Sequence, residues 1–298
     1  MNKIENIYKY IFLDLAYKRD LLIKTNKTTN RGRKSLIKDN EIFYNEIVKL
    51  NKEGKQWRDV KYLASYTVYF KKFKEWSNNN LFKEAYFILI LYLTHHRYIT
   101  YKQLNNCYID STMIRNKQGI ECIGRNYSDK FKNGTKSSVI STENGIPLGL
   151  KIVPSNIHDI NTVEDTIYNS IIKLNNKKIG ADKGYVSKKL KDKLKLEKNI
   201  KLITENKNNS KYKNTYDKKS FLKKRYIIEN LFAWLKNNKK VQLRYDKFLQ
   251  NYEQLHYLSF GLIVQNKFKN HSFAISKRMI KIYKNKIINS ELLNIFLL

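Results

Sequence analysis

The order of secondary-structure elements predicted after residue 104 limits the possible fold more than any other feature of this sequence. A short apolar strand comes first, two strands that form a hairpin follow, and helices and strands then alternate. Asn144-Gly145, between two apolar runs, is a strong hairpin signal. Because hairpin strands pair antiparallel and strand–helix–strand units pair in parallel, the sequence predicts an α/β fold with one mixed sheet and flanking helices.

The bounds of these elements follow from periodicity and capping signals. Asn161 and Glu164 form a possible capping box at the start of one helix, and Ser187 is a candidate cap of the next. Two polar segments are predicted as loops, a basic one at 115–136 and a low-complexity one at 206–216. We predict strands at 107–110, 137–142, 146–153, 178–182 and 200–203, and helices at 161–174, 187–196, 221–239 and 252–267.

The part of the chain before residue 105 is predicted to be helical. Asp39 or Asn40 can cap a helix that Gly54 ends. Short, Lys- and Arg-rich helices between residues 31 and 76 are compatible with a helix-turn-helix DNA reader, and a plain helical support fits the same pattern equally well. The predicted helices cover 7–23, 42–50, a stretch that opens at 57–60, 66–76 and 82–96.

Two of the predicted strands, 107–110 and 178–182, end on or beside a carboxylate, Asp110 and Asp182. The carboxyl ends of adjacent parallel strands meet at one edge of a sheet, so these groups are expected to lie close together. On the 221–239 helix, at about 100° per residue, Glu229 falls between Arg225 and Lys236 on a narrow polar stripe opposite a broad apolar face. Clustered carboxylates repel one another unless a divalent cation binds, and oxygen ligands favour Mg²⁺ or Mn²⁺. A pair of such ions can support phosphoryl transfer.

Each of these residues also has a structural alternative. Asp110 could cap the turn at Ser111, and Asp182 could pair with Lys183. Arg225 and Glu229 could form an ordinary i,i+4 ion pair on a solvated stripe, worth a few tenths of a kcal/mol. It is their joint occurrence, in this order of elements, that favours a metal site.

The charge of the chain indicates a polyanionic partner. Against 26 acidic residues stand 59 Lys and Arg, a formal net charge of +33. Neutralising phosphates releases counterions and drives binding, so nucleic acid is the expected partner. The longest apolar run, 85–93, is too short to cross a bilayer, and no membrane partner is expected. Two cysteines, Cys107 and Cys122, favour a reducing compartment, cytoplasmic or nuclear according to the host.

Several motifs together resemble the DDE transposases of bacterial insertion sequences, specifically insertion-sequence family five and its relatives, which carry a Tyr-Arg-Glu-Lys signature. The resemblance runs from about residue 32 to 269 and departs from the signature at one position, where Leu222 stands in place of the Tyr. The matching motifs are Gly32-Arg33-Lys34, Gln56-Trp57-Arg58-Asp59, Asp110-Ser111-Thr112, Gly134-Thr135-Lys136, Asn156-Ile157-His158-Asp159, Ala181-Asp182-Lys183-Gly184-Tyr185 and Arg225-x3-Glu229-x6-Lys236.

The resemblance implies an RNase H-like catalytic core in which Asp110, Asp182 and Glu229 bind two Mg²⁺ or Mn²⁺ ions. It implies DNA contacts by Arg225 and Lys236, and we expect further DNA contacts from the motif cations Lys136, Lys183 and Arg58. The implied division is an N-terminal helical extension (1–30), a helical region that is a candidate DNA-binding unit (31–104), the catalytic domain (105–269) and a basic, then apolar, tail (270–298).

The sequence thus predicts a DNA transposase that binds terminal inverted repeats, cleaves a strand and joins it to target DNA, acting as a homodimer or larger oligomer on double-stranded DNA. The alternative is a transposase-derived DNA-binding protein without catalytic activity. The intact acidic triad favours the enzyme, and Leu222 is the one residue on the other side.

Overall fold

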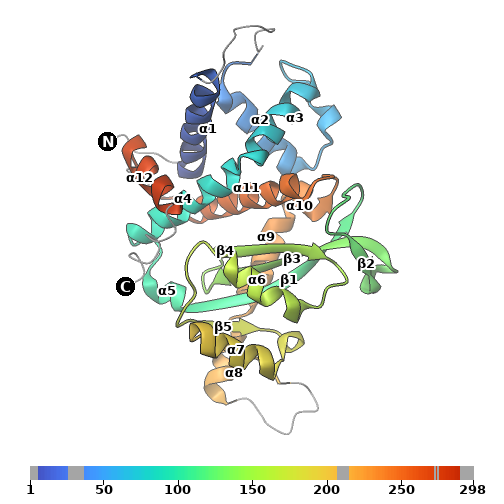
Figure 1. Cartoon of the computed structure of the whole chain (residues 1–298), viewed down its shortest axis with the longest axis vertical. Coiled ribbons are helices and arrows are strands. Elements are labelled where there is room, and N and C mark those ends of the chain that lie inside the picture. Colours follow the sequence, from blue (N-terminus) through green and yellow to red (C-terminus); the bar gives the residue numbers. More distant parts are fainter. Residues whose placement is uncertain (1–5, 26–36, 207–214, 272, 274, 289–298) are drawn as a thin grey trace.

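A seven-stranded mixed sheet forms the lower half of the molecule in the computed structural model (Figure 1), which describes residues 6–25, 37–206, 215–271, 273 and 275–288. Its central strand β1 pairs antiparallel with β3 and parallel with β5. β4 pairs antiparallel with the outer side of β3, and β6 pairs parallel with β5, so the principal order is β4-β3-β1-β5-β6. This order, with three antiparallel strands followed by two parallel to the first, is RNase H-like. The strands are β1 (Asn106–Asn116), β2 (Gly124–Asn126), β3 (Lys132–Thr142), β4 (Pro147–Pro154), β5 (Lys178–Ala181), β6 (Lys201–Thr204) and β7 (Leu243–Arg244).

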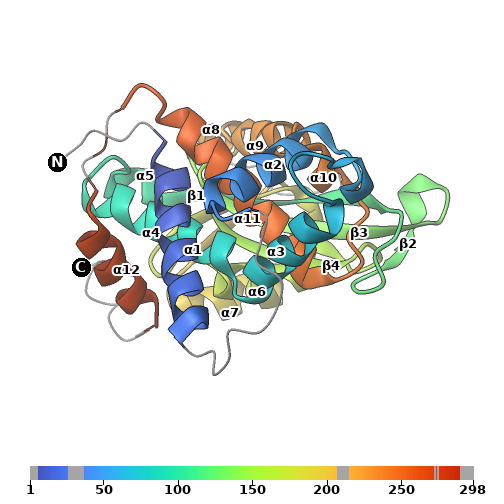
Figure 2. The ribbon, with the colours of Figure 1, turned by 90° about the horizontal axis from the view of Figure 1, so that it is seen from above.

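Helices cover both faces of this sheet. Figures 1 and 2 place α6 and α7 on one face and α8 and α9 on the other. Short 3-10 turns connect several elements: η1 (Trp57–Asp59), η2 (Tyr127–Asp129), η3 (Asp159–Thr162) and η4 (Lys183–Tyr185). The helices near the sheet are α5 (Tyr101–Asn105), α6 (Val163–Tyr168), α7 (Lys188–Lys198), α8 (Tyr216–Lys223), α9 (Tyr226–Lys236) and α10 (Lys239–Gln242).

The upper half of Figure 1 is a helical layer joined to the sheet through one long helix, α11. Aromatic rings fill this layer: Phe12 lies 4.6 Å from Phe82 and 4.9 Å from Trp76, measured between ring centroids. The buried apolar residues of the layer and of the sheet form one continuous cluster. In the described parts of the chain, no helix is long and apolar enough to cross a membrane. The helices of this layer are α1 (Ile7–Thr25), α2 (Asn40–Glu53), α3 (Tyr66–Asn78), α4 (Leu81–His95), α11 (Leu249–Lys267) and α12 (Lys277–Ile288).

The local signals that depend on one turn of chain are confirmed. The Asp39 carboxylate accepts from the Glu41 backbone N–H at the start of α2, and Gly54 ends α2 with φ at 73°. The Ser187 hydroxyl accepts from the Leu190 N–H at the start of α7. The hairpin between β3 and β4 turns at Gly145, whose φ is 69°.

The predicted end of the first strand was wrong. β1 continues six residues beyond Asp110, because residues up to Arg115 pair with β3. For the same reason the predicted basic loop at 115–136 contains β2 and the start of β3. The low-complexity loop predicted at 206–216 falls largely on 207–214, outside the described residues.

Two helix predictions were also wrong. The capping box at Asn161 does not form, because the chain enters a 3-10 turn there and His158 caps that turn. The helix α6 ends at Tyr168, where the chain turns back to β4 and the Ile171 N–H donates to Leu148 O. The stretch that opens at Trp57 is a single 3-10 turn, in which the Asp59 carboxylate accepts from the Gln56 N–H.

The single helix predicted over 221–239 is broken between α8 and α9. The Tyr108 hydroxyl donates to the carbonyl oxygen of Phe221 at a distance of 3.0 Å. In a continuous helix this carbonyl oxygen would accept from the Arg225 N–H. The Arg225 N–H donates to Leu222 O, one residue closer along the chain, and the helix tightens into a 3-10 turn. The break therefore places Arg225 at the very start of α9, next to β1.

Candidate active site

Asp110 and Asp182 lie at the same level on neighbouring parallel strands. Tyr108 on β1 is in register with Gly180 on β5, so two residues further along each strand come Asp110 and Asp182. The Asp110 carboxylate accepts from the Ser111 N–H at 2.8 Å, and the Asp182 carboxylate accepts from the Lys183 N–H at 2.6 Å. The two carboxylates thus also make the local backbone contacts foreseen as structural alternatives, while the sheet brings them to one edge.

Arg225 connects Asp110 with Glu229. Its Nη1 lies 3.2 Å from Asp110 Oδ2 and its Nη2 lies 2.9 Å from Glu229 Oε1. The second contact is the i,i+4 pair read from the sequence. The first joins residues 115 positions apart and depends on the break before α9. One guanidinium therefore links β1 to the helix that carries the third acidic residue.

The electrostatics around Asp110 favour an added cation. The pKa of Asp110 is raised to about 6, first by burial and then by the Asp182 and Asp159 carboxylates, while the Ser111 N–H and the Arg225 guanidinium act in the opposite direction and lower it. Ionised Asp110 is therefore under-compensated by the positive charge already present. A divalent ion near it would supply the missing charge.

A fourth carboxylate, Asp159, belongs to this edge and has no role in the sequence analysis beyond its place in a motif. Its Oδ1 accepts from the Ser111 hydroxyl at 2.6 Å and lies 2.7 Å from Lys136 Nζ. Ser111 directly follows Asp110, so Asp159 fixes the strand beside the candidate site. Tyr185 is buried next to these groups, and burial together with the charges of Asp110 and Asp159 raises the pKa of its hydroxyl.

The donor set of this edge fits a hard divalent cation. Asp110, Asp182 and Glu229 offer carboxylate oxygens only, which are ligands of Mg²⁺ and Mn²⁺. As placed, no three acidic, His or Cys side chains of the described residues are close enough to share a metal ion. The position of Arg225 gives a reason: its guanidinium stands between Asp110 and Glu229 and already balances part of their charge.

The remaining cations singled out in the sequence are spread over different environments. Lys183 is exposed next to Asp182, and Lys236 is exposed at the end of α9. Arg58 is exposed on η1, more than 120 positions before either of them in the sequence. Lys136 is buried, paired with Asp159, and donates to Ile157 O, so its ammonium is engaged inside the protein rather than on the surface. Leu222, at the signature Tyr position, is also buried.

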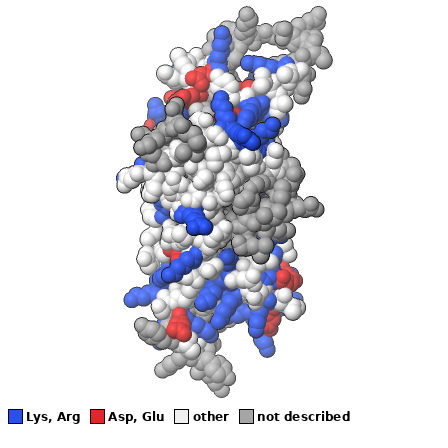
Figure 3. All heavy atoms as spheres, turned by 90° about the vertical axis from the view of Figure 1, so that its left-hand side faces the viewer, with Lys and Arg blue, Asp and Glu red and all other residues white. Residues whose placement is uncertain are grey.

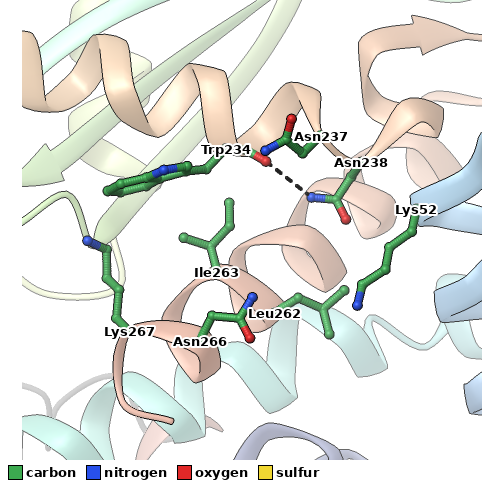
Figure 4. Close-up of a pocket in the computed structure, with 8 residues that line it drawn as sticks. All are labelled: Lys52, Trp234, Asn237, Asn238, Leu262, Ile263, Asn266 and Lys267. Carbon is green, nitrogen blue, oxygen red and sulfur yellow. Dashed lines mark hydrogen bonds between the residues drawn. The ribbon is translucent and has the colours of Figure 1, made fainter.

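A cavity of about 420 Å³ lies between α9 and α11 (Figure 4). Trp234 borders it from α9, Asn238 from the start of α10, and Ile263 and Lys267 from α11. The ammonium of Lys267 lies 4.1 Å from the centre of the Trp234 ring. None of the three candidate acidic residues borders this cavity, so it is separate from the candidate metal site.

With this geometry in hand, comparison with known proteins identifies the family. Residues 105–264, more than half of the chain, match the family described as Transposase DDE domain. The chain belongs to this family. The matched segment of the transposase DDE domain includes Asp110, Asp182, Glu229 and the whole sheet. Comparison with curated proteins gives no match.

Solved structures of transposases show distant likeness to the chain. The piggyBac transposase synaptic complex with hairpin DNA is 9% identical, with a TM-score of 0.46, over 97% of this chain and 80% of that one. A pre-cleavage Mos1 transpososome is 10% identical, with a TM-score of 0.25, over 87% of this chain and 88% of that one. The Mos1 strand transfer complex is 9% identical, with a TM-score of 0.25, over 87% and 86%. These likenesses are too distant to support an argument about function.

Proposed function

We propose that this protein is a DNA transposase whose metal ligands are Asp110, Asp182 and Glu229. The observation that supports this most is the arrangement around Arg225, which holds Asp110 and Glu229 on one guanidinium, while the strand register sets Asp182 beside Asp110. Asp110 on β1 is thus linked to Glu229 on α9 through Arg225 and has Asp182, which follows β5, at the same level of the neighbouring strand, within a transposase DDE domain.

These side chains would hold two Mg²⁺ or Mn²⁺ ions, which when bound supply positive charge against the attacking and leaving oxygens of a phosphate. In the first reaction a water oxygen attacks phosphorus, the bond to the 3′ oxygen breaks, and a 3′ hydroxyl and a 5′ phosphate remain. In the second the 3′ hydroxyl attacks a target phosphodiester, a new diester forms, and a target 3′ hydroxyl leaves. Arg225 orients Asp110 and Glu229 and contributes a fixed charge beside the phosphate.

The surface near this edge suits a phosphate backbone. α7, which follows η4 and Asp182, carries six lysines in eleven residues. Figure 3 shows one face on which Lys and Arg gather toward the lower end, the end where Figure 1 draws α7 and α8. With a formal net charge of +33, we expect many phosphate contacts and a log–log salt slope of magnitude about 5 or more. Besides Arg225, exposed Lys183, which follows Asp182, and exposed Lys236, at the end of α9, would contact DNA, and Arg58 would extend the contact to the helical region at 31–104.

We further propose that the protein belongs with insertion-sequence family five and acts on terminal inverted repeats as a dimer or larger assembly. The test begins with inverted repeats in the flanks of the gene. Duplexes carrying those ends are incubated with the full-length protein and Mg²⁺, and nicks are mapped. Cleavage at the repeat boundary supports the transposase. Tight, salt-sensitive binding without cleavage, in Mg²⁺ and in Mn²⁺, would favour the DNA-binding alternative.

A further inference from the structure

The hairpin formed by β2 and the start of β3 has an aromatic tip that the core does not use. Tyr127 is 70% exposed and Phe131 is 60% exposed, yet their rings contact each other edge to face with centroids 5.3 Å apart. Figures 1 and 2 both show this hairpin projecting from the right-hand end of the sheet. Two large rings are therefore displayed together on a projecting segment, where burial gives them no stabilisation.

The backbone of this tip is held in an uncommon conformation. Lys130 and Phe131 have φ values of 51° and 56°, in the left-handed region that residues other than Gly rarely adopt. Such strain persists only where the surroundings fix it, and it is concentrated at functional segments. Here Arg115 on β1 holds the tip, with Nε and Nη2 donating to the two Asp129 oxygens at 2.6 and 2.9 Å.

The positive charge around the two rings indicates which kind of partner the tip can bind. Between residues 124 and 133 the cations are Arg125, Lys130 and Lys132, all exposed, and the one acidic residue, Asp129, is occupied by Arg115. A second copy of this chain, with a formal charge of +33, would meet like charge at this tip unless DNA lay between the two copies. Exposed aromatic rings among cations instead suit DNA, where bases stack on rings and phosphates meet the ammonium groups.

We propose that the tip of the β2–β3 hairpin, defined by Tyr127, Lys130, Phe131 and Lys132, is a DNA contact that stacks on bases at an opened or kinked step. The proposal rests on the proposed function, since it takes DNA as the substrate. It also fixes a place on that DNA. Asp110 is in register with Val139, seven residues along β3 from Lys132, which corresponds to about 23 Å of strand. A duplex lying along β3 would meet the tip about seven base pairs from the cleaved bond.

The experiment compares wild type with the double variant Tyr127→Ala/Phe131→Ala on two mixed-sequence duplexes that differ only in a central mismatch labelled with 2-aminopurine. Wild type should bind the mismatched duplex more tightly and change the 2-aminopurine fluorescence. The double variant should lose about tenfold in affinity for the mismatched duplex, together with the fluorescence change. Tyr168→Ala removes an aromatic ring that is 63% exposed on α6 and should change neither quantity.

Different failures have different meanings. If wild type binds neither duplex, both the proposed function and this inference are wrong. If wild type binds and cleaves DNA while the double variant keeps the mismatch preference and the fluorescence change, only this inference is wrong. If the double variant alters sedimentation of the protein without DNA, the tip is a protein contact and the inference is again wrong. A thermal melt of the double variant equal to that of wild type excludes misfolding as the cause of a loss.

Discussion

Two arginines that both lie beside β1 show how differently this protein uses the same side chain. Arg244, on β7, is fully buried and donates to the carbonyl oxygens of Glu121, Asp246 and Lys247 and to the Thr135 hydroxyl. Arg225 contacts two carboxylates at the edge of the sheet. The hydrogen-bond acceptors around Arg244 are neutral oxygens. Those around Arg225 are carboxylate oxygens, which can also bind a further cation.

The contrast separates stability from chemistry. Around Arg244 the acceptors come from three segments of chain, so the guanidinium ties these segments together through four hydrogen bonds. Around Arg225, burial and the neighbouring Asp182 and Asp159 carboxylates raise the pKa of Asp110 by more than the Ser111 N–H and the Arg225 guanidinium lower it. A satisfied buried network is expected to hold a fold together, and an under-compensated one is expected to bind something.

The largest effect is expected on the cleavage rate, when the three candidate metal ligands are replaced. Asp110→Asn, Asp182→Asn and Glu229→Gln should each lower single-turnover cleavage by about 10³-fold or more, because each removes a proposed ligand of the ions. DNA affinity should remain close to wild type, because the basic surface is unchanged. A Glu229→Gln protein that cleaves at nearly the wild-type rate would remove Glu229 from the site.

The next effect tests the structural arginine. Arg244→Ala should lower the free energy of unfolding by about 3 kcal/mol or more, since it leaves buried carbonyl groups without donors and opens space beside Tyr252. Urea unfolding followed by circular dichroism measures the change. Arg244→Lys should restore only part of it, because an ammonium cannot reach all four acceptors. A loss below about 1 kcal/mol would contradict the division drawn between the two arginines.

Arg225→Ala should show the reverse pattern. Cleavage should fall by about 10²-fold, the loss expected for a fixed donor near a reacting phosphate, while the melting temperature stays within a few degrees of wild type. Arg225→Lys should rescue partly, since a point charge replaces a two-pronged donor. Should Arg225→Ala unfold the protein while its folded fraction cleaves normally, the residue would have to be grouped with Arg244 as structural.

The smallest effect concerns pH and lies beside Arg244. His256 is buried between the Ser137 hydroxyl and Tyr252 O, and burial lowers its pKa from 6.5 to about 4. Between these two pKa values the unfolded chain binds a proton at His256 and the folded chain does not. The free energy of unfolding therefore decreases as the pH is lowered from about 6.5 to about 4, and the loss is about 2 kcal/mol at pH 5. Asp110 acts in the opposite sense because its folded pKa is raised. The measurement is therefore the difference between wild type and His256→Gln, which both contain Asp110; a difference independent of pH would disprove the account.

What the sequence predicted well depended on short-range chemistry. Gly54 and Ser187 act within one helical turn, and Asn144-Gly145 within one hairpin, so their neighbours along the chain are enough to fix their conformation. The i,i+4 contact of Arg225 with Glu229 has the same origin. The family match at 105–264 agrees with the motif resemblance as far as a DDE transposase, and the finer placement in insertion-sequence family five stays a prediction.

What the sequence could not predict depended on distant partners. The break before α9 needs the Tyr108 hydroxyl, 113 residues away from the carbonyl group it contacts. The burial of Lys136 needs Asp159, and the extension of β1 beyond Asp110 needs β3 as its partner. In each case the deciding contact comes from a segment that the periodicity of the sequence cannot place beside the residue.

The long helix α11 has a consequence for how this protein can be divided. Thirteen of its nineteen residues are buried, and at Gly261 any side chain would meet the Tyr8 ring from α1 at 2.3 Å. The helix that packs against the sheet, with His256 bonded to Ser137 of β3, therefore also packs against the N-terminal helix α1. Unfolding should be a single cooperative event, and a chain that begins at residue 105 should expose α11 and aggregate. Truncated copies of the gene would then yield no independent catalytic half that competes with the full-length protein.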